Sequence, residues 1–266
     1  MIPVVAGSNP VGHPNLSPPA AFGAIAEAAL AQIETNARGA LVSEDPEFLH
    51  QLRVGLRRLR AALRAFHGLL PPKAARKLKR ALRKLSPKLG TARDWDVLVA
   101  RLEADASPAR LLHKARARRA SARRAARRAI VSKRFAGIGS AVRGMAAAES
   151  PDTLTQFGAA ALARAHRKLM AQADGADWAD AAARHAVRIR VKRLRYSCEF
   201  FATAFPSRLA TPYIAALKDL QEILGALNDI SVGRRLIGFD ADEAALLRRL
   251  GAAWPRLAKR SVFWRA

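Results

Sequence analysis

The chain has 266 residues, half of them hydrophobic, so it can bury a core in one large domain or two small ones. Lysine and arginine total 47 against 21 acidic residues, which gives a formal net charge of +26. A field of this sign attracts nucleic acid, acidic membranes or phosphate polymers. The single cysteine, Cys198, excludes an internal disulfide framework and a cysteine metal site, and no apolar run is long enough for a membrane span.

Residues 1–19 hold five prolines and little charge, and they predict a flexible tail without a secretory signal. Together with the lone cysteine, this favours a reduced, cytoplasmic setting. From about residue 20 the hydrophobic pattern has the helical period almost everywhere, which predicts an all-α fold. Prolines and glycines, among them Gly90 and Gly225, set the expected ends of the helices. The predicted helices span 20–42, 45–69, 72–89, 93–104, 108–131, 134–148, 152–173, 177–204, 208–225, 228–237, 240–252 and 255–265.

The helices form two series that align without a gap at a shift of 135 residues, the separation of His50 from His185. Other pairs at the same shift are Phe22 with Phe157, Phe66 with Phe201, Pro71 with Pro206 and Asp94 with Asp229. A match of this length predicts an internal duplication, with repeat 1 at about 20–148 and repeat 2 at about 151–266. We expect two helical bundles related by a pseudo-twofold axis.

A row of basic side chains borders the apolar stripe of the predicted helix over residues 49–66. The row consists of His50, Arg53, Arg57, Arg60 and Arg64, and the second series repeats it with His185, Arg188, Lys192 and Arg195. Glu199 stands where the first series has Arg64. Side chains at the border of a buried stripe line the groove between helices, and like charges one turn apart repel each other. The two rows therefore indicate a basic groove or central channel that holds a polyanion.

Two further helices add candidate contacts for the anion. Residues 73–88 contribute Lys79, Arg80 and Arg83, and residues 113–134 contribute Arg123 and Arg127. Arginine outnumbers lysine about three to one, and its planar fork matches phosphate oxygens two at a time. The alternative for most of these cations is a solvated surface or a pairing with the chain's own acids. For the two histidines it is helix packing or capping, whereas the functional role would be a hydrogen bond to phosphate.

The motifs resemble those of the CHAD family, the conserved histidine α-helical domain. The residues that carry the resemblance run from His50 to Arg60 and from His185 to Tyr196, with Leu89–Asp94 and Leu224–Asp229 downstream. The resemblance implies a helical domain with internal pseudo-symmetry and a basic channel over about residues 20–265. It also implies binding of inorganic polyphosphate and association with polyphosphate granules. The resemblance further implies that the anion is contacted by His50, Arg53, Arg57, Arg60, His185, Arg188, Lys192 and Arg195.

The sequence has no phosphate loop, no HExxH or GxSxG motif and no acidic calcium loop. We therefore expect a non-catalytic protein without a cofactor or metal. The Asp94/Asp229 pair leaves open an enzyme that acts on polyphosphate with a metal, although helix capping or ion pairing is the simpler role for these residues. The other alternative is an RNA- or DNA-binding protein that uses the same basic surface. Against it, the basic rows lack interleaved aromatic residues for base stacking.

Overall fold

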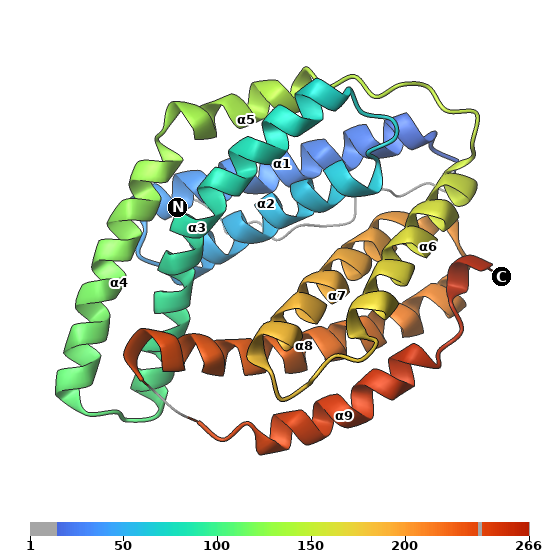
Figure 1. Ribbon diagram of the computed structural model, residues 1–266. Coiled ribbons are helices and arrows are strands. Elements are labelled where there is room, and N and C mark those ends of the chain that lie inside the picture. Colours follow the sequence, from blue (N-terminus) through green and yellow to red (C-terminus); the bar gives the residue numbers. More distant parts are fainter. Residues whose placement is uncertain (1–14, 239–240, 266) are drawn as a thin grey trace. The chain divides into compact units, whose positions relative to one another are not determined.

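The computed structural model describes residues 15–238 and 241–265 (Figure 1). Over these residues the chain forms nine α-helices and two short 3-10 helices, with no β-strand, which confirms the predicted all-α fold. The helices fall into two compact units. Among the described residues, unit 1 comprises residues 22–149, and unit 2 comprises residues 15–21, 150–238 and 241–265. Within the described ranges, none of the helices is long and apolar enough to cross a membrane.

Unit 1 contains the helices α2 to α5 and α1 from Phe22 onward. Their bounds are α1 Pro18–Val42, α2 Pro46–Ala65, α3 Pro72–Ala104, α4 Ala109–Ile130 and α5 Lys133–Arg143. Asp45 caps α2, since its carboxylate accepts a hydrogen bond from the Glu47 backbone N–H at 2.8 Å. The predicted apolar stripe of α2 is buried, with Leu52, Leu59 and Leu63 fully inaccessible to solvent. This stripe directs α2 against α3, so that the neighbouring basic row lies along α3, and α2 also lies close to α1 at Gly55.

Gly55 explains how closely α1 approaches α2. A Cβ atom at this position would lie 2.9 Å from Cγ1 of Ile33 and 3.2 Å from the Ala29 carbonyl oxygen, both on α1. Any other residue would therefore push the two helices apart. The close approach fixes α2, and with it the basic row that α2 carries.

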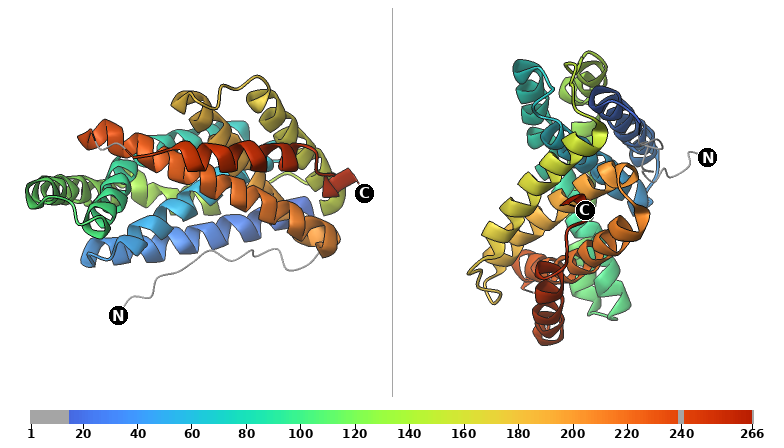
Figure 2. Two further views of the ribbon diagram at one scale, coloured as in Figure 1. Left: turned by 90° about the horizontal axis from the view of Figure 1, so that it is seen from below. Right: turned by 90° about the vertical axis from the view of Figure 1, so that its right-hand side faces the viewer.

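Unit 2 contains the remaining helices. Their bounds are α6 Leu154–Ala173, α7 Ala181–Phe201, η1 Ala202–Ala204, α8 Ser207–Ile237, α9 Ala244–Ala258 and η2 Phe263–Arg265. Thr153 and Gln156 form a capping box at the start of α6, and Asp180 caps α7. The stripe of α7 that includes Val187, Val191 and Leu194 is fully buried, as predicted. Helix α9 runs alongside α8, as two further views show (Figure 2).

The two units repeat local features at the predicted shift of 135 residues. Helices α2 and α7 begin at Pro46 and Ala181, and each follows an aspartate cap. Helices α3 and α8 begin at Pro72 and Ser207, and each follows a proline. Two aromatic pairs also correspond: the ring centroids of Phe22 and Phe66 are 5.7 Å apart, and those of Phe157 and Phe201 are 6.2 Å apart. These local correspondences lie at the shift that the sequence predicts for a duplication, and the duplication itself stays a prediction.

Three predicted helix breaks are wrong. The break predicted between residues 252 and 255 lies inside α9, which continues through Pro255 to Ala258. Helix α3 continues through Gly90 and α8 continues through Gly225, so each is one long helix rather than two short ones. A glycine inside a helix costs only about 1 kcal/mol relative to alanine, which tertiary packing outweighs. As a result Asp94 and Asp229 lie inside helices, and the capping role considered for them is also wrong.

The predicted tail at the start of the chain is two residues too long. The predicted tail over 1–19 falls mostly outside the described residues, but Pro18 and Pro19 belong to the first turn of α1. Proline is favourable here because the backbone N–H groups of a helix's first turn have no acceptor within the helix, so the N–H that proline lacks costs no hydrogen bond.

Candidate functional site

The basic row of α2 lies against α3 in unit 1. The two helices are antiparallel neighbours, so each step forward along α2 meets a step back along α3 (Figure 1). Nη1 of Arg60 donates a hydrogen bond to Oγ of Ser86 at 3.1 Å. Nη1 of Arg53 lies 2.8 Å from the point that a Cβ atom of Gly90 would occupy, so its guanidinium rests directly on the α3 backbone.

Further cations from α3 face the same row. We call the resulting surface the α2–α3 face; it consists of His50, Arg53, Arg57, Arg60, Arg64, Lys79, Arg83 and Arg93. The pKa shifts of two of these cations show that they lie close to one another. Burial and then the charge of Arg83 lower the pKa of Arg60, and burial and then Arg64 lower the pKa of Lys79. Like charges thus meet across the two helices at partly desolvated positions.

His50 lies at one end of the α2–α3 face. Burial and then the charge of Arg93 lower its pKa, Arg57 and Arg53 act in the same direction, and Glu47 opposes them. Nearby, Nε of Arg57 is buried without a hydrogen-bond partner among the described residues. A buried donor without an acceptor is unfavourable, and an anion placed on this face would relieve the repulsion between the cations.

The corresponding α7–α8 face of unit 2 consists of His185, Arg188, Lys192 and Arg195 on α7, with their neighbours on α8. Nδ1 of His185 lies 3.0 Å from Oδ1 of Asn228, the counterpart of Arg93. Nε of Arg195 donates to Oε1 of Gln221, the counterpart of Ser86, at 2.8 Å. His185 and Arg195 of unit 2 thus meet α8 at the same places, and at the first of them the neutral Asn228 stands where unit 1 has the cation Arg93.

Glu199 adds an acid to the face of unit 2. Its carboxylate forms an ion pair with Arg195, one helical turn away, and both side chains are largely buried. The Arg195 guanidinium also lies over the Tyr196 ring, with Cζ at 4.5 Å from the ring centroid. The guanidinium of Arg195 therefore has an internal counter-charge, whereas the partner of Arg60 among the described residues is a neutral hydroxyl.

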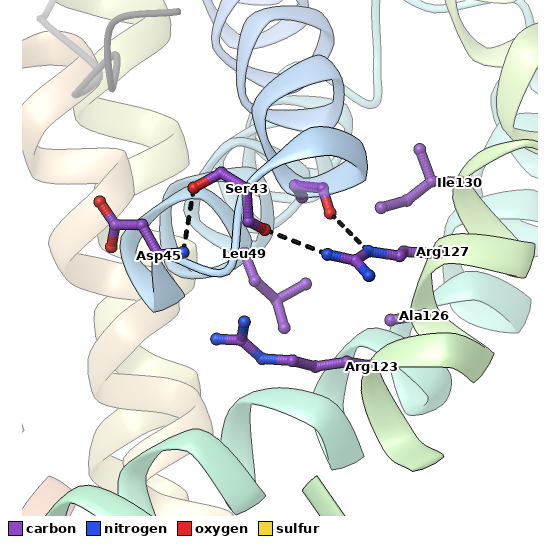
Figure 3. Close-up of a pocket in the computed structure, with 8 residues that line it drawn as sticks. Ser43, Asp45, Leu49, Arg123, Ala126, Arg127 and Ile130 are labelled. Atoms are coloured by element: carbon purple, nitrogen blue, oxygen red, sulfur yellow. Dashed lines mark hydrogen bonds between the residues drawn. The ribbon is translucent and has the colours of Figure 1, made fainter. Parts of the chain in front are cut away.

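Arg123 and Arg127 were predicted to contact the anion, but the structure gives both of them internal partners. Nε of Arg123 donates to Asp96 at 2.8 Å and its Nη1 lies 2.7 Å from the Glu44 carboxylate. Arg127 donates to the same Glu44 carboxylate at 2.7 Å and to the backbone carbonyls of Ala40 and Ser43 at 3.2 Å (Figure 3). These two arginines therefore attach α4 to the loop between α1 and α2.

A small pocket beside these arginines is lined by Ala40, Ser43, Asp45, Leu49, Arg123, Ala126, Arg127 and Ile130 (Figure 3). Its volume is about 20 Å³, which is room for roughly one water molecule rather than for a polymer. Among the described residues, no group of His, Cys, Asp or Glu side chains is arranged to hold a metal ion.

Arg80 lies exposed on α3, where it extends the positive surface beside Lys79 and Arg83. The residues that sequence reasoning missed are those opposite the row: Arg93, Ser86 and Gly90 in unit 1, and Asn228 and Gln221 in unit 2. Arg93 and Asn228 stand 135 residues apart, and so do Ser86 and Gln221, so the predicted repeat could have indicated these positions. The partner of Arg195 was also missed, although Glu199 lies at the i+4 spacing typical of helical ion pairs.

Comparisons with known proteins agree with this architecture. The solved structure described as the CHAD domain from the plant Ricinus communis is 29% identical, with a TM-score of 0.76, and the match covers 100% of this chain and 95% of that one. PptA from Streptomyces chartreusis is 18% identical with a TM-score of 0.61, over 92% and 98% of the two chains, and shows the fold alone. No curated protein matches the chain. The sequence model of the CHAD domain matches residues 24–238, and the chain belongs to the CHAD domain family.

Proposed function

We propose that this protein binds inorganic polyphosphate, with the α2–α3 face as its contact surface and without catalysing a reaction. The observation that carries the proposal is the crowding of like charges across α2 and α3. Burial and then the charge of Arg83 lower the pKa of Arg60, and burial and then the charge of Arg64 lower the pKa of Lys79; Arg60 and Lys79 are both partly buried. A chain of phosphates laid along the face would supply a negative charge at every step.

The shape of the row favours a single phosphate strand. The cations of α2 recur every three or four residues, so they form one line along the helix axis. The face contains no tryptophan, tyrosine or phenylalanine on which a base could stack. A ligand that is phosphate alone needs no such platform. The family resemblance supports the same ligand, and we propose on that basis a location in the cytoplasm, at polyphosphate granules.

Replacement of four cations tests the proposal. In the variant Arg53→Ala/Arg57→Ala/Arg188→Ala/Lys192→Ala, we expect the affinity for long-chain polyphosphate to fall by roughly a hundredfold or more at moderate salt, because several phosphate contacts are lost together. The melting temperature and helix content should stay close to those of the wild type. Titration calorimetry or fluorescence anisotropy at several salt concentrations measures the loss. If the wild type neutralises about six phosphates, its log–log salt slope should be near −4.

A second variant controls for net charge. This variant also removes four positive charges, two from each unit, but at exposed positions on α4 and α9. Its substitutions are Arg124→Ala/Arg128→Ala/Arg248→Ala/Arg249→Ala. We expect its affinity to stay within about threefold of the wild type, since distant surface charges contribute only a screened field. Equal losses in the two variants would show that polyphosphate responds to total charge and not to these faces.

A further inference from the structure

We infer that Glu199 closes the unit 2 copy of the site, so that the α2–α3 face of unit 1 carries nearly all of the polyphosphate binding. The inference rests on the proposed function and adds to it the residue that decides which copy works. It begins from the three contacts of the Arg195 guanidinium, with Glu199, Gln221 and Tyr196.

The contacts of Arg195 leave little of its guanidinium for a ligand. Its Nη1 and Nε groups donate to protein oxygens, its flat face lies over a ring, and its side chain is only 13% exposed. A phosphate could take the place of the Glu199 carboxylate only by leaving that carboxylate 18% exposed and without its cation. Removing one partner of such a pair is unfavourable, so Glu199 competes directly with the phosphate.

The corresponding positions of unit 1 lack this competition. Arg64 stands where unit 2 has Glu199, and its near neighbour is the cation Lys79. Arg60 donates to the Ser86 hydroxyl, which it can share with a phosphate without separating opposite charges. At the other end, Arg93 faces His50, whereas Asn228 faces His185. At these two positions unit 1 presents a cation where unit 2 presents an acid or an amide, whereas Arg83 has the cation Lys218 as its counterpart.

The acids of α8 deepen the contrast. Asp219 and Glu222 are exposed on α8, whereas the matching stretch of α3 carries Lys84, Pro87 and further cations without an acid. Glu199 differs from these two exposed acids because it forms an ion pair with Arg195, a member of the row. Its removal should therefore restore a contact, and removal of Glu222 should change only the general field.

The test compares two glutamates in a background without the unit 1 contacts. In the protein that carries Arg53→Ala/Arg57→Ala/Arg60→Ala, we expect Glu199→Gln to tighten polyphosphate binding by about fivefold to tenfold, as one charge-assisted contact is regained. Glu222→Gln makes the same change in net charge at an exposed position of the same unit, and we expect less than a twofold effect. Melting temperatures confirm that each variant is folded. Glu199→Arg, which copies Arg64, should bind at least as tightly as Glu199→Gln.

Three outcomes separate this inference from the proposed function. Equal effects of Glu199→Gln and Glu222→Gln, with a wild type that binds polyphosphate, would overturn the inference alone. The same holds if Arg188→Ala/Lys192→Ala/Arg195→Ala weakens the wild type as much as the unit 1 triple variant does. A wild type that fails to bind polyphosphate overturns both the inference and the proposed function.

Discussion

At the residue scale, the arginines of this protein differ in the partners that the fold gives them. Arg123 is almost fully buried and ends on two carboxylates, whereas Arg60 is half-buried and ends on a hydroxyl beside another arginine. The first arrangement is complete within the protein. In the second, the described residues give the positive charge a hydroxyl partner and another cation as its neighbour, and a bound anion would stabilise this state.

Arg123 should therefore be needed for stability and not for binding. Its loss leaves Asp96, whose side chain is 1% exposed, as a buried carboxylate without its cation. We expect Arg123→Ala to lower the free energy of unfolding by about 3 kcal/mol, the effect typical of breaking a buried ion pair. Urea denaturation followed by circular dichroism measures the change. The exposed neighbour Arg124 provides the control, since Arg124→Ala should change stability by less than about 0.5 kcal/mol. Similar losses in the two variants would contradict the structural role.

His50 should make polyphosphate binding depend on pH. Burial and then Arg93 hold its pKa below the ordinary value of 6.5 in the free protein, with Arg57 and Arg53 adding to the effect and Glu47 opposing it. A bound anion reverses the local field and raises that pKa, so binding takes up a proton between the two values. The affinity should therefore increase as the pH falls through this window, from near neutral pH into the acidic range.

The variant His50→Gln isolates this contribution. It keeps a hydrogen-bond donor but does not titrate, so the pH dependence of its binding should be flatter than that of the wild type. Binding constants measured at constant ionic strength over the window provide the comparison. An affinity that falls on acidification, or an equal slope in the variant, would contradict the assigned role of His50.

At the element scale, a substitution of Gly90 in helix α3 should affect stability and binding in opposite directions. The position is helical, so alanine should stabilise the helix by up to about 1 kcal/mol. A Cβ atom there would also displace the Arg53 guanidinium, which lies 2.8 Å from that point and is the mobile end of a flexible side chain. We therefore expect Gly90→Ala to raise the melting temperature while it weakens polyphosphate binding severalfold.

Gly225 of α8 is the matched control for Gly90. No heavy atom outside its own helix turn lies within 4 Å of its Cβ position, so Gly225→Ala should raise the melting temperature without moving a cation. Thermal denaturation and a polyphosphate titration of both variants separate the two effects. Equal binding by both variants would show that the position of the Arg53 guanidinium on α3 does not matter.

The helices show how far the sequence alone could lead. The apolar stripes of α2 and α7 followed from periodicity, because burial of one helix face leaves a direct trace in the spacing of leucines and valines. Gly90 and Gly225 were misleading, since propensity is a local quantity and the long helices α3 and α8 are stabilised by packing.

The candidate site could be predicted on one side only. The row on α2 was visible because its residues are near in sequence and share a helix face. The partners of these residues come from distant parts of the chain. Arg93 is 43 residues from His50, and Ser86 is 26 residues from Arg60. The acid partners of Arg123 are 27 and 79 residues away from it. Which cations have an internal acid is therefore a property of the fold, and it removed Arg123 and Arg127 from the proposed site.

At the scale of the whole molecule, the net charge of +26 guarantees attraction to any polyanion and selects none. Selection must come from the arrangement of the cations. In unit 1 they form a line without aromatic residues, which suits a strand of phosphates and offers nothing to bases. Nucleic acid should therefore bind through its phosphates alone and lose to a ligand of higher charge density.

Competition between the two polyanions tests this account most directly. The protein is first saturated with fluorescently labelled single-stranded RNA, and long-chain polyphosphate is then added at fixed salt and pH. We predict that polyphosphate displaces the RNA when the two are present at equal concentrations of phosphate. RNA that stays bound under these conditions would contradict polyphosphate as the ligand of the α2–α3 face.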